Sequence, residues 1–183
     1  MNSQTSDTDK RVLVLDTSAF LAGLDPFSIG VEQVTVPKVE EEIKRNSIIK
    51  MRFETAIESG KLKVKAPTQE FSNKAKRSAS KVGDSFNLSE TDMQLLTLAL
   101  ELKAEDYIPQ IVTDDYSIQN VATQMEIEFL PLATFGIKRP LEWIRYCPAC
   151  HREYRADCKP KECQVCGTEL KRKPRRTTKR LKR

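Results

Sequence analysis

The segment RVLVLDTSAF, residues 11–20, contains a short apolar run that ends in a carboxylate. Its first part is rich in Val and Leu and is typical of a buried strand. Asp16 follows at once, and the small hydroxyl and apolar residues after it favour a short helix. Aspartate is a common helix N-cap, and that role alone would account for Asp16. The alternative is that a rigid buried strand places Asp16 in a functional site.

Strand-like and helix-like segments alternate from residue 11 to about residue 130. Strands separated by helices of this length predict right-handed crossovers and a mostly parallel sheet with helices on both faces. The expected fold class is therefore α/β and Rossmann-like. The expected strands are residues 12–16, 32–36, 61–67, 110–114 and 126–132, and the expected helices are residues 18–23, 38–59, 69–82, 89–103 and 117–125.

The composition is that of a soluble globular protein, with 39% apolar and 31% charged residues. No apolar run approaches the roughly 20 residues that a membrane span needs. The first ten residues are polar and lack the apolar core of a signal peptide. We therefore expect a cytoplasmic protein that has no membrane partner and whose cysteines stay reduced.

Four cysteines form two CxxC pairs separated by twelve residues. Each pair can bend around one cation, and four thiolates complete the tetrahedral shell of a structural zinc site. A redox-active CxxC pair is the less favoured alternative. Cys158 and His151 lie between the pairs, but the symmetry of the two pairs leaves them out of the expected site. The predicted zinc ligands are Cys147, Cys150, Cys163 and Cys166.

Two segments are strongly basic. The chain ends in KRKPRRTTKRLKR, residues 171–183, with nine Lys or Arg and no acid. Such an arm can bind nucleic acid because each phosphate contact releases counterions, although a merely solvated tail has the same composition. The segment KAKRSASK, residues 74–81, is the second. The predicted RNA-binding residues are Lys74, Lys76, Arg77, Lys81, Lys179, Arg180, Lys182 and Arg183.

The alternation of strands and helices stops near GIKRPLEWIRY, residues 136–146. We therefore expect an α/β domain over residues 10–137 and a linker over residues 138–145. A zinc ribbon should follow over residues 146–170, and a basic, disordered tail over residues 171–183. The ribbon is too short to build a hydrophobic core, so metal binding should supply its folding free energy.

Helical periodicity separates two acidic residues from their neighbours. In a helix over residues 89–103, Asp92 falls within the stripe formed by the leucines, although it also suits a capping box with Ser89. In a continuous helix over residues 38–59, Glu42 lies in the apolar face, whereas Glu41 lies opposite. A charge on the buried side of a helix is costly unless it is paired or bound to metal.

Asp114 and Asp115 follow an apolar strand, as Asp16 does. The carboxyl ends of parallel strands share one edge of a sheet, where ligands bind in open α/β folds. The helix that carries Glu42 begins at the same edge of the sheet. Asp92 also lies at this edge if residues 67–88 return the chain to it. Carboxylates crowded on one edge repel one another unless a cation lies among them. Ligation by oxygen alone favours Mg²⁺ or Mn²⁺.

The residues that the sequence lacks narrow the chemistry. His151 is the only histidine, so neither a histidine-pair nuclease site nor a Ser-His-Asp triad is available. The sequence also has no phosphate-binding GxxxxGK[ST] loop. An acidic metal cluster without histidine suits metal-assisted hydrolysis of phosphodiesters, in which the metal lowers the pKa of a bound water.

Four segments, taken in order, resemble the acidic motifs of PIN-domain ribonucleases: VLVLDTSAF, VPKVEEEIK, LSETDMQLLTLALEL and IVTDDYSIQNVA. With the ribbon that follows, the chain resembles the archaeal and eukaryotic endonuclease family that trims the 3′ end of small-subunit ribosomal RNA. The resemblance implies a PIN-like fold, a Mn²⁺- or Mg²⁺-dependent cut leaving a 3′-hydroxyl, and a pre-ribosomal particle, with assembly factors as possible partners. It assigns Asp16, Glu42 and Asp92 as catalytic metal ligands, and both Asp114 and Asp115 qualify as the last.

Two other functions remain open on the sequence alone. A phosphotransfer protein also ends strands of a parallel sheet in aspartate, but it would want a second acid two residues after Asp16, where this chain has Ser18. A non-catalytic RNA-binding assembly factor could use the acidic cluster to hold a structural ion. Cleavage of a labelled RNA with and without Mn²⁺ separates these functions.

Overall fold

The computed structural model describes residues 10–44, 47–134, 136, 141–158 and 160–175. Its larger part is a five-stranded parallel sheet in the order β3-β2-β1-β4-β5. The expected α/β fold with a mostly parallel sheet is confirmed. The strands are β1 (Arg11–Leu15), β2 (Glu32–Thr35), β3 (Leu62–Val64), β4 (Ile108–Val112) and β5 (Glu128–Leu130).

The central strand, β1, is buried over residues 12–15 and pairs with β2 on one side and β4 on the other. Strands buried on both faces read as continuous apolar runs, which is why this segment lacks an alternating pattern. Because β1 lies in the middle of the sheet, the residue that follows it lies in the middle of the carboxyl edge. Asp16 is therefore placed by the order of the strands.

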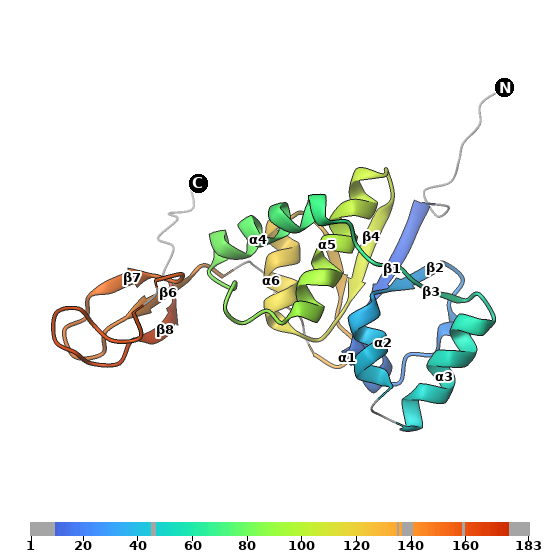
Figure 1. Cartoon of the computed structure of the whole chain (residues 1–183), viewed down its shortest axis with the longest axis horizontal. Coiled ribbons are helices and arrows are strands. Elements are labelled where there is room, and N and C mark those ends of the chain that lie inside the picture. The colour runs from blue at the N-terminus through green and yellow to red at the C-terminus, as the bar shows by residue number, and fades with distance from the viewer. Residues whose placement is uncertain (1–9, 45–46, 135, 137–140, 159, 176–183) are drawn as a thin grey trace, which may run out of the picture.

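Helices α3, α5 and α6 pack against this sheet, and α4 packs on α5 and α6 (Figure 1). Three helices, α1, α5 and α6, begin directly at capping residues with side-chain bonds, namely Asp16, Ser89 and Asp115. Among the described residues, no helix has the length and apolarity needed to cross a bilayer. The helices are α1 (Thr17–Leu21), the 3-10 turn η2 (Pro26–Ser28), α2 (Pro37–Ile43), α3 (Ser47–Glu58), α4 (Gln69–Val82), α5 (Glu90–Ala104) and α6 (Tyr116–Gln124).

The single helix expected over residues 38–59 is wrong. Two helices occupy this stretch, α2 and α3, and residues 45–46 between them lie outside the described residues. Helix α3 contacts both α2 and β3, which a straight continuation of α2 would not allow. The break lets Phe53 on α3 join Ile43 on α2 in the same core.

The cysteine-rich part forms a three-stranded antiparallel sheet in the order β7-β6-β8. Its strands are β6 (Trp143–Tyr146), β7 (Glu153–Arg155) and β8 (Lys171–Pro174). The expected linker and tail are thus corrected, because residues 143–145 and 171–174 are strands of the ribbon. Cations on β8 lie over aromatic rings of β6: Arg172 is 4.0 Å from the Trp143 ring centroid and Lys173 is 4.8 Å from that of Tyr146.

The ribbon lies at one end of the molecule, beside α4 and α6 (Figure 1). Asp84, only 1% exposed, forms an ion pair with Arg172 of β8 and accepts a hydrogen bond of 2.5 Å from the Asn120 amide on α6. The Asn120 side chain also exchanges two hydrogen bonds with the backbone of Leu141. A buried carboxylate needs such partners, and among the described residues the cation that pairs with this one comes from the docked ribbon.

Gly83 lies at the closest approach of the two parts. It adopts φ +76°, and a Cβ placed there would lie 2.6 Å from both the Ala156 Cβ and the Trp143 carbonyl oxygen. Gly60 has a similar φ of +72° but nothing within 4 Å of such a Cβ. The two glycines share the backbone requirement, and only Gly83 is also constrained by the ribbon.

We therefore expect Gly83→Ala to destabilise the protein clearly more than Gly60→Ala. Each variant incurs roughly 1–2 kcal/mol for a left-handed alanine, and Gly83→Ala adds an overlap worth roughly 1–3 kcal/mol. Thermal unfolding, with limited proteolysis to follow release of the ribbon, measures the difference. Equal melting temperatures would show that the ribbon does not pack on Gly83 in solution.

Candidate active site

Asp16 is held at the end of β1 by three hydrogen bonds. It is 7% exposed and accepts from the Thr17 amide at 2.7 Å, the Ser18 hydroxyl at 2.7 Å and the Thr113 hydroxyl at 2.8 Å. The bond from Thr17 is the helix cap that the sequence suggested. The bond from Thr113 comes from the end of the neighbouring strand, β4. Asp16 is therefore both a cap and a buried acid fixed between two strand ends.

Burial raises the pKa of Asp16 above its ordinary value. The hydrogen bonds from Ser18, Thr113 and Thr17 act in the opposite direction, and the nearby negative charge of Glu42 adds to the rise. Removing water disfavours the charged form of a carboxyl group, and a second acid disfavours it further. The ionised form at this position would be stabilised by a bound cation.

Glu42 projects from α2 toward the same place. Its carboxylate accepts a hydrogen bond of 2.5 Å from the Thr17 hydroxyl on α1 and another of 2.6 Å from the Thr91 hydroxyl on α5. Its two neighbours point elsewhere, since Glu40 pairs with a lysine at 2.9 Å and Glu41 with another at 3.2 Å. Helical periodicity predicted that Glu42 differs from its neighbours in this way. The position of α2 alone places its side chain, without the continuous helix that was expected.

Asp92 reaches the same edge from the first turn of α5. It completes a capping box, accepting from the Ser89 amide at 2.7 Å. Partial burial raises the pKa of Asp92, and the charges of Asp115 and Asp16 contribute to the rise. The chain through α4 thus returns to the carboxyl edge, as the sequence argument required, and the capping role coexists with a place beside the other acids.

The structure distinguishes Asp114 from Asp115. The Asp114 carboxylate accepts hydrogen bonds from the backbone amides of Leu132, Ala133 and Thr134. Although partial burial works against ionisation, these bonds lower the pKa of Asp114. Asp115 instead caps α6 through the Ser117 amide at 2.6 Å and is close enough for its charge to act on Asp92. The Asp114 carboxylate is thus taken up by amides of residues 132–134, whereas the charge of Asp115 acts on the acidic group.

Hydroxyl side chains hold the acids in place, and the sequence analysis did not assign them. The Thr113 hydroxyl donates to Asp16 and accepts from the Asp115 amide at 3.1 Å, while the Ser18 hydroxyl accepts from the Asp114 amide at 3.2 Å. The sequence could have indicated these hydroxyl residues, because each acidic motif except that of Glu42 carries one beside or close to its acid. These residues are Thr17, Ser18, Thr91 and Thr113.

The donor set suits a hard divalent cation. In the part of the chain that the structure describes, none of the four converging acids forms an ion pair with Lys or Arg. Buried or crowded carboxylates without cationic partners are costly, and oxygen ligands are those that Mg²⁺ and Mn²⁺ prefer. Their oxygens are more widely spaced than a closed metal shell, since they do not all lie within 4.8 Å of one another. The four acids are Asp16, Glu42, Asp92 and Asp115.

The four cysteines do form a compact donor set. All four sulfurs lie within 4.8 Å of one another, the only such set of three or more potential ligands among the described residues. Hydrogen bonding from the Tyr154 hydroxyl at 3.1 Å lowers the pKa of the Cys163 thiol to about 6. The thiolate is the metal-binding form, and four thiolates suit a structural zinc site.

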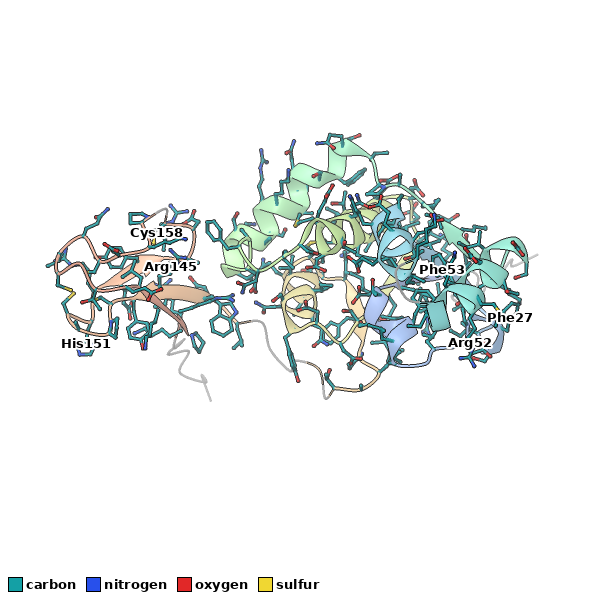
Figure 2. All side chains as sticks on the ribbon, turned by 60° about the horizontal axis from the view of Figure 1, so that its bottom comes forward. Phe27, Arg52, Phe53, Arg145, His151 and Cys158 are labelled. Atoms are coloured by element: carbon teal, nitrogen blue, oxygen red, sulfur yellow. The ribbon has the colours of Figure 1, made fainter. Side chains whose placement is uncertain are left out.

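Cys158 and His151 stay outside that set. The Cys158 sulfur lies 3.9 Å from the Pro160 carbonyl oxygen. His151 is exposed and lies at the far tip of the ribbon, away from the α/β domain (Figure 2). Neither residue belongs to the four-cysteine cluster, and His151 is remote from the acidic edge.

The cations expected to bind RNA are placed on α4. Its buried face is formed by Ala75, Ala79 and Val82, and the basic side chains are exposed on the remaining surface. Within the described residues none of these cations forms an ion pair with an acid. They are Lys74, Lys76, Arg77 and Lys81. The other predicted RNA-binding residues, Lys179, Arg180, Lys182 and Arg183, lie outside the described residues.

A parallel α/β sheet with four acids converging on its carboxyl edge, followed by a four-cysteine ribbon, defines the class of a nuclease with an acidic metal site. Residues 13–102 match the PIN domain of ribonuclease. The chain belongs to the Nob1 family of PIN-domain endoribonucleases, as three relatives show.

All three relatives are named Endoribonuclease Nob1. The protein from Methanocaldococcus jannaschii is 39% identical over 163 residues, which cover 89% of this chain and 78% of the relative. That from Methanothermobacter thermautotrophicus is also 39% identical and covers 89% and 93% of the two chains. That from Pyrococcus abyssi is 40% identical and covers 91% and 96%. Matched spans of 163–167 residues are long enough that the similarity extends beyond the α/β domain into the ribbon.

Replacing Cys147 or Cys166 with Ser should release a bound metal ion, because each supplies one of four thiolates. Cys158→Ser is the matched control and should retain the metal, since its sulfur is outside the cluster. Native mass spectrometry and elemental analysis of the purified proteins measure the metal content. A wild-type protein with no zinc, or a Cys158→Ser protein that loses it, would contradict the assignment.

Proposed function

We propose that this protein is a Mn²⁺- or Mg²⁺-dependent endoribonuclease that cleaves precursor ribosomal RNA at the 3′ end of the small-subunit RNA. The observation that carries the proposal is the convergence of Asp16, Glu42, Asp92 and Asp115 on one edge without a cationic side chain. Family membership supports the ribonuclease class, and resemblance to the family that trims this RNA supports the substrate. The setting would be a cytoplasmic pre-ribosomal particle, with assembly factors as further partners.

The residues of the site have separate roles in this proposal. Asp16, the most buried of the four acids, would be the principal ligand of the catalytic cation, and Glu42, Asp92 and Asp115 would complete its acidic surroundings. A bound divalent cation supplies a water of lowered pKa and stabilises charge on the leaving oxygen. Thr113 and Ser18 keep the Asp16 oxygens oriented, and the hydroxyls of Thr17 and Thr91 do the same for Glu42.

The exposed cations of α4 would hold the RNA backbone beside this edge. Phosphate contacts position a nucleic acid without reading its sequence, so these residues contribute affinity and not the choice of cleavage site. The basic residues Lys179, Arg180, Lys182 and Arg183 would add further phosphate contacts. In the described part of the chain end, Arg172 and Lys173 already pair with acids, at Asp84 and Glu153.

Asp115→Asn and Asp114→Asn should separate catalysis from stability. Asparagine caps a helix about as well as aspartate, so Asp115→Asn should keep its melting temperature and lose cleavage by orders of magnitude. Asp114→Asn should cleave near the wild-type rate but melt lower at neutral pH. Its lowered pKa means that the ionised carboxylate stabilises the fold, and this contribution is lost as the pH falls through that pKa.

Asp16→Asn and Glu42→Gln belong in the same assay, with Glu41→Gln as the matched control. The first two should abolish cleavage. Because burial raises the pKa of Asp16, its charge opposes folding above that pKa, so Asp16→Asn should melt no lower than wild type without added Mn²⁺. The substrate is a labelled RNA spanning the mature 3′ end, beside one with that junction scrambled. An Asp16→Asn protein that cuts at the wild-type rate would contradict the role of Asp16, and a wild type that does not cut with Mn²⁺ would leave the non-catalytic RNA-binding function.

Replacing Lys76, Arg77 and Lys81 together with Ala should weaken RNA binding and flatten its salt dependence. Each lost phosphate contact reduces the slope of log affinity against log salt by about 0.7 for single strands, so the slope should change by about 2. The matched control replaces Lys10, Arg11 and Lys61, which are exposed beside the amino ends of β1 and β3. Equal slopes for the two triple variants would place the RNA elsewhere.

A further inference from the structure

A small cavity lies between the start of α6 and the docked ribbon. It encloses about 220 Å³ and is lined by Tyr116 and Ser117 of α6, Leu141 and Trp143 leading into the ribbon, and Arg172 of β8, with Asp84 and Asn120 at its polar end. We propose that this cavity holds one unpaired base of the substrate RNA, stacked on Tyr116. The proposal rests on the proposed function and names the way in which that substrate is gripped.

The position of Tyr116 ties the cavity to the acidic site. Tyr116 is the first residue of α6 and directly follows Asp115, which caps that helix. Its side chain is 52% exposed, although aromatic residues of this size are usually more covered. A nucleotide bound at the acidic edge would therefore have an aromatic surface one residue away from a predicted metal ligand.

The polar side chains of Asp84, Asn120 and Arg172 that line the cavity already bond to protein groups. The Asn120 amide donates to Asp84 and to the Leu141 carbonyl oxygen, at 2.5 and 2.8 Å. Arg172 donates to the Asp84 carboxylate and to the Gly83 carbonyl oxygen. What remains for a ligand is chiefly the flat apolar surface of Tyr116, Trp143 and Leu141. Such a surface favours stacking over recognition of base edges.

The size of the cavity agrees with a single base. It is smaller than the roughly 300–1,000 Å³ of a typical small-molecule site. Aromatic stacking beside a basic surface is how proteins hold single-stranded nucleic acid with little sequence preference. Lys81 of α4 lines a neighbouring cavity together with Trp143, and Arg172 lies 4.0 Å from the Trp143 ring centroid. This combination favours RNA over a peptide or a neutral metabolite.

The cavity exists only while the ribbon is docked. Leu141, Trp143 and Arg172 form one wall, and the buried Asp84–Arg172 ion pair keeps that wall against α6. The ribbon would thus shape a substrate-binding pocket beside the acidic edge, in addition to any contact that it makes with RNA through its own surface.

The test compares Tyr116→Ala with Tyr116→Phe, which keeps the ring. Tyr107→Ala is the matched control, since Tyr107 is 37% exposed and directly precedes β4, at the opposite edge of the sheet. Binding of a single-stranded RNA spanning the cleavage site is measured without added Mn²⁺ or Mg²⁺. Tyr116→Ala should raise the Kd about tenfold, whereas Tyr116→Phe and Tyr107→Ala should stay within about twofold of wild type.

A series of RNAs with one abasic position each locates the stacked base. For wild type, removing the base at one position should raise the Kd about tenfold. Removing the same base should not weaken binding by Tyr116→Ala any further. Unchanged binding by a folded Tyr116→Ala protein, or equal losses at every abasic position in both proteins, would overturn the pocket. Cleavage by wild type with Mn²⁺ is measured separately. If wild type cuts RNA but neither binding experiment shows stacking on Tyr116, the pocket proposal is wrong and the proposed function stands.

Discussion

The Asp16 carboxylate accepts hydrogen bonds from Thr17, Ser18 and Thr113 at the end of the central strand, and the surrounding loops are built on these bonds. The Thr113 hydroxyl also accepts a hydrogen bond from the Asp115 amide, and the Ser18 hydroxyl accepts one from the Asp114 amide. The first turn of α1 and the turn between β4 and α6 are therefore fixed by one buried acid. Moving Asp16 would disturb the turn that carries Asp115 and the first turn of α1, whose Thr17 hydroxyl donates to Glu42.

This arrangement places function and stability in opposition. Burial and neighbouring acids raise the pKa of Asp16 and of Asp92, so the metal-free protein is less stable when they are ionised. The hydroxyl groups around Asp16 and Glu42 reduce this cost without neutralising the charge. A lysine in their place would stabilise the fold and remove the site's affinity for a cation. The choice of threonine and serine thus preserves negative charge for a ligand.

A second buried acid, Asp84, performs a different task. It is almost inaccessible, and its partners are Asn120 on α6 and Arg172 on the ribbon. The cationic partner of this buried acid comes from the ribbon, so a variant that lacks Arg172 would leave the Asp84 charge buried and without that cation. The α6 helix that carries Asn120 begins at Asp115. The ribbon is consequently connected, through one helix, to the edge where the RNA would be cut.

The sequence by itself determined the parallel α/β fold and the four clustered cysteines, and it predicted Asp16, Glu42 and Asp92 as site acids, because periodicity and strand ends are local properties. Asp16 ended an apolar strand, and Glu42 and Asp92 fell on apolar helix faces. Only the tertiary structure shows that Asp114 and Asp115 differ in their surroundings, since the difference lies in amides of residues 132–134 that are distant in sequence. It also divided α2 from α3 and extended the ribbon to Trp143 and Pro174. Those boundaries depend on packing against β3 and on cations over aromatic rings, which local patterns do not encode.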